Sequence, residues 1–368
     1  MILVAFGTRP EGIKLAPVIR ALREREGQRI TVANVGQHAQ MLEQHMAPFE
    51  IVPDHRLEVI RPGQPLDELT ARALTELSAV LRAEHPDLVV VQGDTTTVFA
   101  AGLAAFYERI PVAHVEAGLR TGIPELPFPE EMNRRLLGAL TTLHFPPTEA
   151  ARQNLLREGV PDRNILVTGN TVIDAVRWMS ARAETPPDLK PVLDDPRRRI
   201  VVTAHRRESW GIPMDAIGEA LAQLSEDPAV LIVFPIHPNP VVRESILPRV
   251  DGRDNVVMCE PLAYPGFVRL MASATLLLTD SGGIQEEAAA LGKPVLVMRD
   301  VTERAEGVET GTSVMVGRDV DAIVMTARRL LADPDEYRRR AQAPNPYGDG
   351  RAAERIADRI GAFLEQTS

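Results

Sequence analysis

Short apolar runs rich in β-branched residues alternate with helical patterns along most of this chain, and no other feature constrains its fold as strongly. This alternation is typical of βαβ units, in which a helix connects two parallel strands of one sheet. In the first half of the chain, the predicted strands cover residues 2–6, 30–35, 88–92, 112–115 and 165–168. The sequence therefore predicts an open α/β sheet in this half.

A Pro- and Asp-rich stretch at residues 185–196 interrupts the pattern, and such a composition is typical of a linker. We therefore predict two Rossmann-like domains, residues 1–184 and 185–350, followed by a helical segment at residues 351–368. Ligands of open α/β sheets bind at the carboxyl ends of the strands, so we expect the two domains to face a cleft that holds the site. The predicted strands of the second domain are residues 200–203, 230–234, 255–258, 275–279 and 294–298.

The composition narrows the class of protein. A formal net charge of -10 without a long basic block disfavours nucleic acid as a partner. The apolar runs are far shorter than the roughly 18 residues that span a bilayer, and the first residues lack the basic flank of a secretory signal, so we expect a soluble, cytoplasmic protein. The single cysteine, Cys259, excludes an intrachain disulfide and a cysteine-built zinc site. We expect no bound metal and no membrane partner.

The segment after the first strand, residues 7–14, has two glycines and a lysine and superficially suggests a phosphate-binding loop. The spacing does not fit that loop, because Ile13 separates Gly12 from Lys14 and no Ser or Thr follows. The third glycine of the dinucleotide fingerprint is also missing. Arg9 and Lys14 then lie at a helix start, where cations and backbone N–H groups can meet an anionic ligand. The alternative is that both are solvated charges on a surface helix.

Three acidic residues of the first domain stand at positions suited to acid–base chemistry. Asp94 follows the strand at residues 88–92, and Glu116 follows the next predicted strand. Neighbouring parallel strands lie about 4.8 Å apart, so two such carboxylates can converge on one ligand atom. Glu130 opens a helix after a proline-rich loop. A helix N-cap at Asp94 and a favourable helix dipole at Glu130 are the structural alternatives.

Two segments of the second domain are suited to binding phosphate. His205 directly follows a predicted strand and precedes two arginines, where it can meet a pyrophosphate; the alternative is an exposed loop histidine. Residues 279–287 are predicted to form a strand end, a glycine-bearing turn and a helix N-terminus, which favours an anion. Glu286 or Glu287 can then reach the ribose of the same nucleotide. A simple tight turn is the competing interpretation.

Seven segments, spread over nearly the whole chain, resemble in this order those of the non-hydrolysing UDP-N-acetylglucosamine 2-epimerases. They are FGTRPE at 6–11, GDTTT at 93–97, HVEAGLR at 114–120, PEE at 129–131, HRRE at 205–208, DSGGIQEE at 280–287 and NPYGDG at 345–350. The resemblance implies a fold of the glycosyltransferase-B class, with the nucleotide bound mainly by the C-terminal domain and the last helix packed on the N-terminal domain. It also implies a homodimer.

The resemblance further implies reversible conversion of UDP-N-acetylglucosamine into UDP-N-acetylmannosamine without NAD or another cofactor. The family cleaves the anomeric C–O bond, releases UDP and the C2 proton to form 2-acetamidoglucal, and adds UDP again after reprotonation on the other face. By motif, Asp94, Glu116 and Glu130 handle the C2 proton and the oxocarbenium charge, and His205 assists the leaving phosphate. The residues implied to bind the UDP-sugar are Arg9, Lys14, Phe267, Ser281, Gly282, Gly283, Glu287 and Arg304.

Some members of the family are also activated by their own substrate at a second site. The matching positions here are Gln37, Gln40, Glu130, Arg206 and His237, although Ala39 stands where an arginine is frequent. Alternative functions remain open: a hydrolysing relative that releases UDP and free N-acetylmannosamine, a glycosyltransferase of the same fold, or a non-catalytic nucleotide-sugar sensor. We find no signature of an acceptor site.

Overall fold

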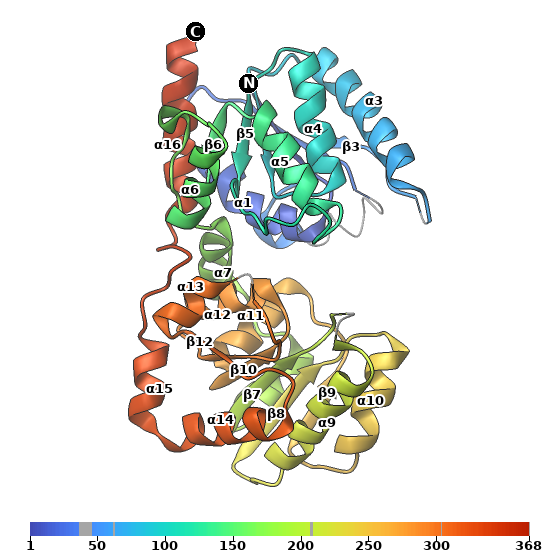
Figure 1. Ribbon diagram of the computed structural model, residues 1–368, viewed down its shortest axis with the longest axis vertical. Coiled ribbons are helices and arrows are strands. Elements are labelled where there is room, and N and C mark those ends of the chain that lie inside the picture. The colour runs from blue at the N-terminus through green and yellow to red at the C-terminus, as the bar shows by residue number, and fades with distance from the viewer. Residues whose placement is uncertain (37–45, 62, 207–208, 303, 368) are drawn as a thin grey trace. The chain divides into compact units, whose positions relative to one another are not determined.

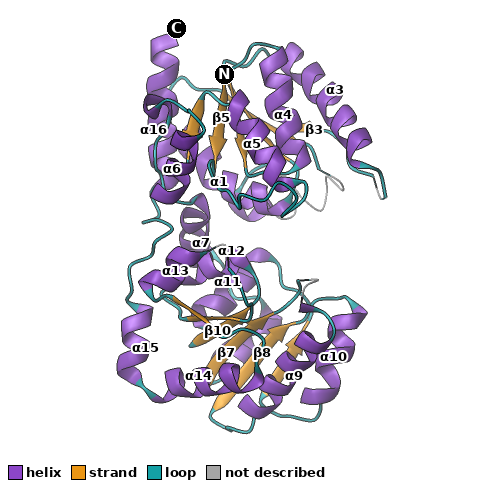
Figure 2. Cartoon of the chain, in the orientation of Figure 1, coloured by secondary structure: helices purple, strands orange, loops and turns teal. Residues whose placement is uncertain are grey.

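The computed structural model describes residues 1–36, 46–61, 63–206, 209–302 and 304–367, which form an α/β structure (Figures 1 and 2). Its strands within these residues are β1 (Ile2–Phe6), β2 (Ile30–Asn34), β3 (His55–Arg56), β4 (Leu88–Gln92), β5 (Val112–Val115), β6 (Leu143–Phe145), β7 (Arg198–Thr203), β8 (Val230–Pro235), β9 (Val256–Cys259), β10 (Leu276–Thr279), β11 (Val295–Val297) and β12 (Ser313–Met315). Its α-helices are α1 (Arg9–Arg23), α3 (Leu66–Glu84), α4 (Thr96–Tyr107), α5 (Glu130–Leu140), α6 (Glu149–Arg157), α7 (Thr171–Arg182), α8 (Lys190–Asp194), α9 (Ile212–Leu224), α10 (Pro240–Val250), α11 (Tyr264–Ser273), α12 (Gly282–Ala290), α13 (Ala305–Thr310), α14 (Val320–Ala332), α15 (Pro334–Ala341) and α16 (Ala352–Thr367).

The strands form two parallel sheets with the same topology. The first sheet has the order β3-β2-β1-β4-β5-β6 and the second has β12-β11-β10-β7-β8-β9, each six-stranded within the described residues. Counted from its own first strand, each sheet therefore has the doubly wound order 3-2-1-4-5-6. The connections change direction between β1 and β4 in one sheet and between β7 and β10 in the other. Ligands of such sheets bind beyond the carboxyl ends of these strands.

Helices cover both faces of each sheet, so the central strands are mostly apolar and buried (Figure 2). In the first sheet, alternate residues of β1, Leu3 and Ala5, pack in one core with Leu77 of α3 and Ala101 of α4. In the second, Ile200 and Val202 of β7 lie in a core with α9, α10 and α14. The buried strands hold the polar loops at their ends in fixed positions.

The chain divides into two compact units, Met1–Ala175 with Gly348–Ser368, and Val176–Tyr347. The predicted boundary at residue 185 lies after α7, whereas the units divide inside this continuous helix. The carboxylate of Asp174, in the first turn of α7, accepts hydrogen bonds from the N–H groups of Ala352 and Ala353 at 3.3 and 3.0 Å. It thereby caps α16, which packs against α1 in the first unit. No helix of the described residues is long and apolar enough to cross a membrane.

The predicted α/β class and the two doubly wound domains are confirmed, whereas the predicted strand at residues 165–168 is wrong. Only Ile165 forms a bridge, to His144, and the edge strand is β6. The short apolar run at 165–168 instead follows β6 through single backbone bonds, such as that from Leu166 N–H to the His144 carbonyl at 2.9 Å. The short strands β3, β6 and β12 were not predicted, because two or three residues give too little alternation to detect.

Candidate functional site

The first unit brings its polar residues together where its sheet changes direction. Gly7 follows β1, and Gly93 and Asp94 follow the neighbouring strand β4. Gly93 has a φ of 83°, a left-handed conformation in which glycine carries no steric penalty. The turn places Asp94 immediately before α4, whose N-cap is Thr95 and not Asp94. The N-cap alternative for Asp94 is therefore wrong, and its side chain is available for other contacts.

The start of α1 is organised by a residue that the sequence did not single out. Glu11 is buried, and its Oε2 accepts the N–H groups of Gly7 at 2.6 Å and Thr8 at 3.2 Å. Burial raises the pKa of this carboxyl, and these two N–H groups lower it in part. Arg9, the first residue of the helix, is exposed, and Lys14 lies one turn further on.

Lys14 reaches across to Glu116, the residue that follows β5. Its Nζ donates to both carboxylate oxygens, at 2.6 and 2.8 Å, and the amides of Gln92 and Asn170 donate to the same carboxylate. Glu116 is nearly buried and has a φ of 64°, which is uncommon for a residue with a side chain. Such strained positions persist where surrounding contacts hold them and are frequent at functional sites. Lys14 is thus a partner of Glu116, a contact that the sequence did not predict.

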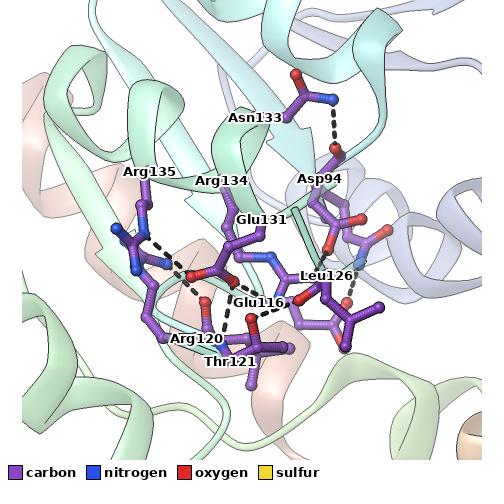
Figure 3. A network of polar contacts seen from close by, with 12 residues as sticks. Asp94, Glu116, Arg120, Thr121, Leu126, Glu131, Asn133, Arg134 and Arg135 are labelled. Atoms are coloured by element: carbon purple, nitrogen blue, oxygen red, sulfur yellow. Dashed lines mark hydrogen bonds and ion pairs between the residues drawn. The ribbon is translucent and has the colours of Figure 1, made fainter. Parts of the chain in front are cut away.

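Asp94 lies close to these groups and makes a different contact (Figure 3). One oxygen of its carboxylate lies 2.7 Å from Nη2 of Arg134 on α5. Asn133 of the same helix donates to the Asp94 backbone carbonyl at 3.0 Å. Burial raises the pKa of Asp94, and the negative charge of Glu116 adds to the rise, while Arg134 and Lys14 oppose it. A carboxyl in this state is suited to exchanging a proton with a ligand.

Glu130 is the first residue of α5 and is half-buried. Its negative charge also raises the pKa of Asp94. Its neighbour Glu131, which the sequence did not single out, is fully buried and takes part in the polar network with Arg134. A signal for this role was present, because Glu131, Arg134 and Arg135 have the i, i+3 and i, i+4 spacing of helical ion pairs.

Two histidines lie beneath these loops. His114 on β5 and His144 on β6 are paired in register and almost fully buried. The Nε2 of His114 lies 2.8 Å from the carbonyl oxygen of Gly93, directly before Asp94. Burial lowers the pKa of His114 to about 3 and that of His144 to about 4. Both rings are therefore neutral at pH 7, and His114 can donate a hydrogen bond to Gly93.

The second unit is organised around Asp280, which follows β10 and has no exposed surface. Its Oδ2 accepts the backbone N–H groups of His205 at 3.0 Å and Arg206 at 2.9 Å, and its Oδ1 lies 3.5 Å from Nδ1 of His205. The loops after β7 and β10 are thereby joined where this sheet changes direction. The His205 side chain is 46% exposed, so it is accessible to a ligand. Its ring stacks on that of His237, with centroids 6.2 Å apart.

Two arginines converge on the start of α12. Ser281 is the N-cap residue and Gly282 the first residue of the helix. A Cβ atom on Gly282 would lie 3.6 Å from Cζ of Arg304 and 3.7 Å from Nη2 of Arg206. A Cβ on Gly283 would have no described atom within 4 Å. Backbone N–H groups, the helix dipole and two guanidinium groups together make this an anion-binding arrangement.

The other predicted ligand-binding residues of this unit occupy neighbouring helices. Arg304 donates from Nε to Glu286 at 2.6 Å, which fixes the guanidinium beside α12. Glu287 is buried and accepts a hydrogen bond from the Tyr264 hydroxyl at 3.0 Å. Phe267 lies half-buried on α11, one turn after Tyr264. Gln37 and Gln40 lie outside the described residues.

Known proteins resemble the chain over its full length. The family model described as UDP-N-acetylglucosamine 2-epimerase matches residues 20–361. The UDP-N-acetylglucosamine 2-epimerase of Yersinia pestis is 50% identical over 363 residues, which cover 96% of each chain. The crystal structure of the UDP-GlcNAc 2-epimerase from Neisseria meningitidis bound to UDP-GlcNAc has a TM-score of 0.88 and 43% identity, with 99% of each chain covered.

The enzyme of Methanocaldococcus jannaschii in complex with UDP-GlcNAc and UDP has a TM-score of 0.81 and 34% identity, and the match covers 98% of this chain and 99% of that one. Both solved structures share the fold of this chain, including the two doubly wound sheets expected for the glycosyltransferase-B class. In this chain, the loops that directly follow strands carry Asp94, Glu116, His205 and Asp280. From the family model and the full-length relatives, the chain belongs to the UDP-N-acetylglucosamine 2-epimerase family.

Proposed function

We propose that this protein interconverts UDP-N-acetylglucosamine and UDP-N-acetylmannosamine by inverting the sugar at C2, without net hydrolysis. The relative from Yersinia pestis bears the name of this activity, and the enzymes of Neisseria meningitidis and Methanocaldococcus jannaschii are described with UDP-GlcNAc bound. The observation that carries the proposal is the pair of carboxylates, Asp94 and Glu116, at the ends of two adjacent strands, one with a raised pKa and the other held by Lys14.

The chemistry explains why carboxylates and a diphosphate site are both needed. C2 of the sugar carries no acidic proton, so a base alone cannot exchange it. Cleavage of the C1–O bond moves the bonding electrons to UDP and leaves positive charge at C1, which makes the C2 proton removable. Loss of that proton gives 2-acetamidoglucal. Protonation of C2 on the opposite face and attack of UDP at C1 then complete the epimer, with no net oxidation.

We assign the proton transfers and the stabilisation of positive charge to the first unit. Asp94, with its raised pKa, is suited to take up or deliver the C2 proton near neutral pH. Glu116, held by Lys14 and two amides, is suited to face the positive charge at C1. Glu130 supplies the third acidic group beside Asp94.

We assign the diphosphate of UDP to the second unit. The start of α12, with Arg206 and Arg304 beside Gly282, offers N–H groups and two cations to the phosphates. We assign to His205, whose backbone N–H and ring both lie beside Asp280, the protonation of the leaving phosphate oxygen. Glu287 is assigned to the ribose. The remaining residues that we assign to UDP-sugar binding are Arg9, Lys14, Phe267, Ser281 and Gly283.

One assay separates this function from its alternatives. The protein is incubated with UDP-GlcNAc alone in deuterium oxide, and the products are followed by NMR. We expect UDP-ManNAc to appear with deuterium at C2. Free N-acetylmannosamine with UDP would instead identify a hydrolysing enzyme, and no reaction would fit a transferase or a sensor. Epimerisation without deuterium at C2 would contradict elimination and re-addition.

We also propose that substrate activates the enzyme at a second site built from Gln37, Gln40, Arg206 and His237, with Glu130 shared. The stacking of His237 on His205 supports this assignment, because it connects a residue of the second site with one proposed for catalysis. The forward rate is then sigmoidal in UDP-GlcNAc. A hyperbolic curve with full reverse activity on UDP-ManNAc alone would contradict it.

The family resemblance further supports a homodimer, which the solution mass of the purified protein tests. It also supports a cytoplasmic location.

A further inference from the structure

Glu131 is an ionised group with no exposed surface, which is rare unless partners compensate its charge. Its carboxylate accepts the backbone N–H groups of Thr121 at 3.0 Å and Gly122 at 3.4 Å, and the Nε of Arg135 at 3.0 Å. These donors outweigh the burial that raises the pKa of Glu131, and together with Arg134 they hold it below its usual value. Glu131 is therefore ionised at neutral pH.

The partner that connects this charge to the chemistry is Arg134. Its Nη1 lies 3.6 Å from Glu131, and its Nη2 lies 2.7 Å from Asp94. The Arg134 side chain is only 11% exposed, so water screens these interactions weakly. Figure 3 shows the guanidinium of Arg134 between the two carboxylates, with Arg135 on the far side of Glu131. Arg134 thus pairs with two carboxylates: Glu131, which is ionised, and Asp94, which can exchange a proton.

The geometry has an electrostatic consequence for Asp94. A guanidinium that faced Asp94 alone would stabilise its ionised form strongly and hold it as a carboxylate. Glu131 compensates part of this positive charge and also fixes where the guanidinium lies. Asp94 can thereby still be protonated while it remains paired with Arg134.

We propose that Glu131 is a positioning residue that acts through Arg134: it holds the guanidinium against Asp94 and shares its charge, and so tunes the acidity of Asp94. This inference rests on the proposed role of Asp94 in C2 proton transfer. It assigns to Glu131 a function separate from that of its neighbour Glu130, which faces the acid–base group directly in the proposed mechanism.

The test is a double-mutant cycle read from the pH dependence of kcat/KM for UDP-GlcNAc. Glu131→Gln leaves Arg134 facing Asp94 alone, so the apparent pKa that Asp94 contributes should move down. Arg134→Met removes the cation, so the same apparent pKa should move up. In the double variant, Glu131→Gln should no longer shift the apparent pKa, because Arg134, through which Glu131 acts, is absent. We also expect kcat of Glu131→Gln to fall by roughly 10- to 100-fold through misplacement of Arg134.

Controls separate this role from a purely structural one. Glu149→Gln removes an exposed carboxylate paired with Arg152 in the same unit and should leave the profile unchanged. Glu131→Asp keeps the charge and should recover most of the wild-type profile; if Glu131→Gln does not fold, Glu131→Asp replaces it, with a smaller shift in the same direction. The inference would be overturned if the apparent pKa shifted in the same direction in both single variants. It would also be overturned if Glu131→Gln still shifted this pKa in the absence of Arg134. Absence of any UDP-ManNAc from the wild-type enzyme would instead refute the proposed function.

Discussion

The two units share one topology, but different side chains gather at the ends of their strands. In each, the polar loops follow the strands between which the sheet changes direction, β1 and β4 in the first unit and β7 and β10 in the second. The first unit gathers carboxylates there, whereas the second gathers Arg206 and Arg304 at a helix N-terminus. The backbone therefore determines where the polar loops lie, and a few side chains at the strand ends determine whether a loop is suited to exchanging a proton or to binding an anion.

The buried histidines sharpen this contrast. Among the described histidines, His114 and His144 lie inside the first unit as neutral rings. His205 of the second unit is exposed, and His237 is half-buried. His114 and His144 thus support the loops of the first unit from below, whereas His205 of the second unit is accessible to a ligand.

The largest effect is expected from removing the acid–base group of the first unit. Asp94→Asn keeps the shape of the side chain but cannot exchange the proton, so kcat should fall by about 10² to 10⁴. UDP affinity, measured by calorimetry, should remain, because the diphosphate is assigned to the other unit. Asp162→Asn, at an exposed carboxylate paired with Arg152, serves as the matched control. Loss of UDP binding in Asp94→Asn would contradict the assignment of proton transfer and diphosphate binding to different units.

The corresponding change in the second unit is Gly282→Val. The valine methyl groups would lie between the start of α12 and the guanidinium groups of Arg206 and Arg304. Because charge-assisted hydrogen bonds to phosphate would be lost, UDP affinity should fall by about 10- to 100-fold, with the fold retained by circular dichroism. Ala332→Val, at an exposed position of α14, controls for the added bulk. Unchanged UDP affinity in a folded Gly282→Val protein would rule out binding of the diphosphate at the start of α12.

The histidines of the two units should respond differently to acid. His114 takes up a proton near pH 6.5 when unfolded but only near pH 3 when folded, so the unfolded chain binds more protons between these values. Stability from His114 is therefore present above pH 6.5 and lost as the pH falls. Between pH 7.5 and pH 5 the loss is about 2 kcal/mol, which His114→Gln should abolish. Urea unfolding at both pH values measures it, with exposed His205→Gln as the comparison. Equal pH dependence in wild type and His114→Gln would contradict a buried neutral ring.

The smallest effect concerns the end of the chain. Asp174→Ala removes the cap of α16 and should destabilise the first unit by about 1 kcal/mol. Both tryptophans, Trp178 and Trp210, belong to the second unit. In an unfolding experiment, the loss of stability should therefore be larger when unfolding is followed by circular dichroism than when it is followed by tryptophan fluorescence. An equal change in both signals would mean that the two units unfold together.

Much of the site was predictable because parallel strands end at a common edge. Once the buried strands were recognised, Asp94 and Glu116, which follow consecutive strands, could be expected near one another. The pairing of β7 with β10, which joins the loop of His205 to that of Asp280, was not predicted, because β7 and β10 are not consecutive in the chain. The contacts of Lys14 were not predictable, because a lysine at a helix start can face a ligand, solvent or a carboxylate 102 residues away. Glu131 was missed in favour of Glu130, because adjacent residues on a helix point about 100° apart and the sequence does not state which one faces the protein.

By itself, the sequence determined the α/β class, the presence of two domains and the loops with candidate functional residues, because hydrophobic periodicity and turn residues are local properties of the chain. Only the tertiary structure decided which carboxylate is buried, which cation it shares and how far its pKa moves. Those quantities depend on burial and on charges a few ångströms away that belong to distant segments, as when Arg134 of α5 meets Asp94 after β4.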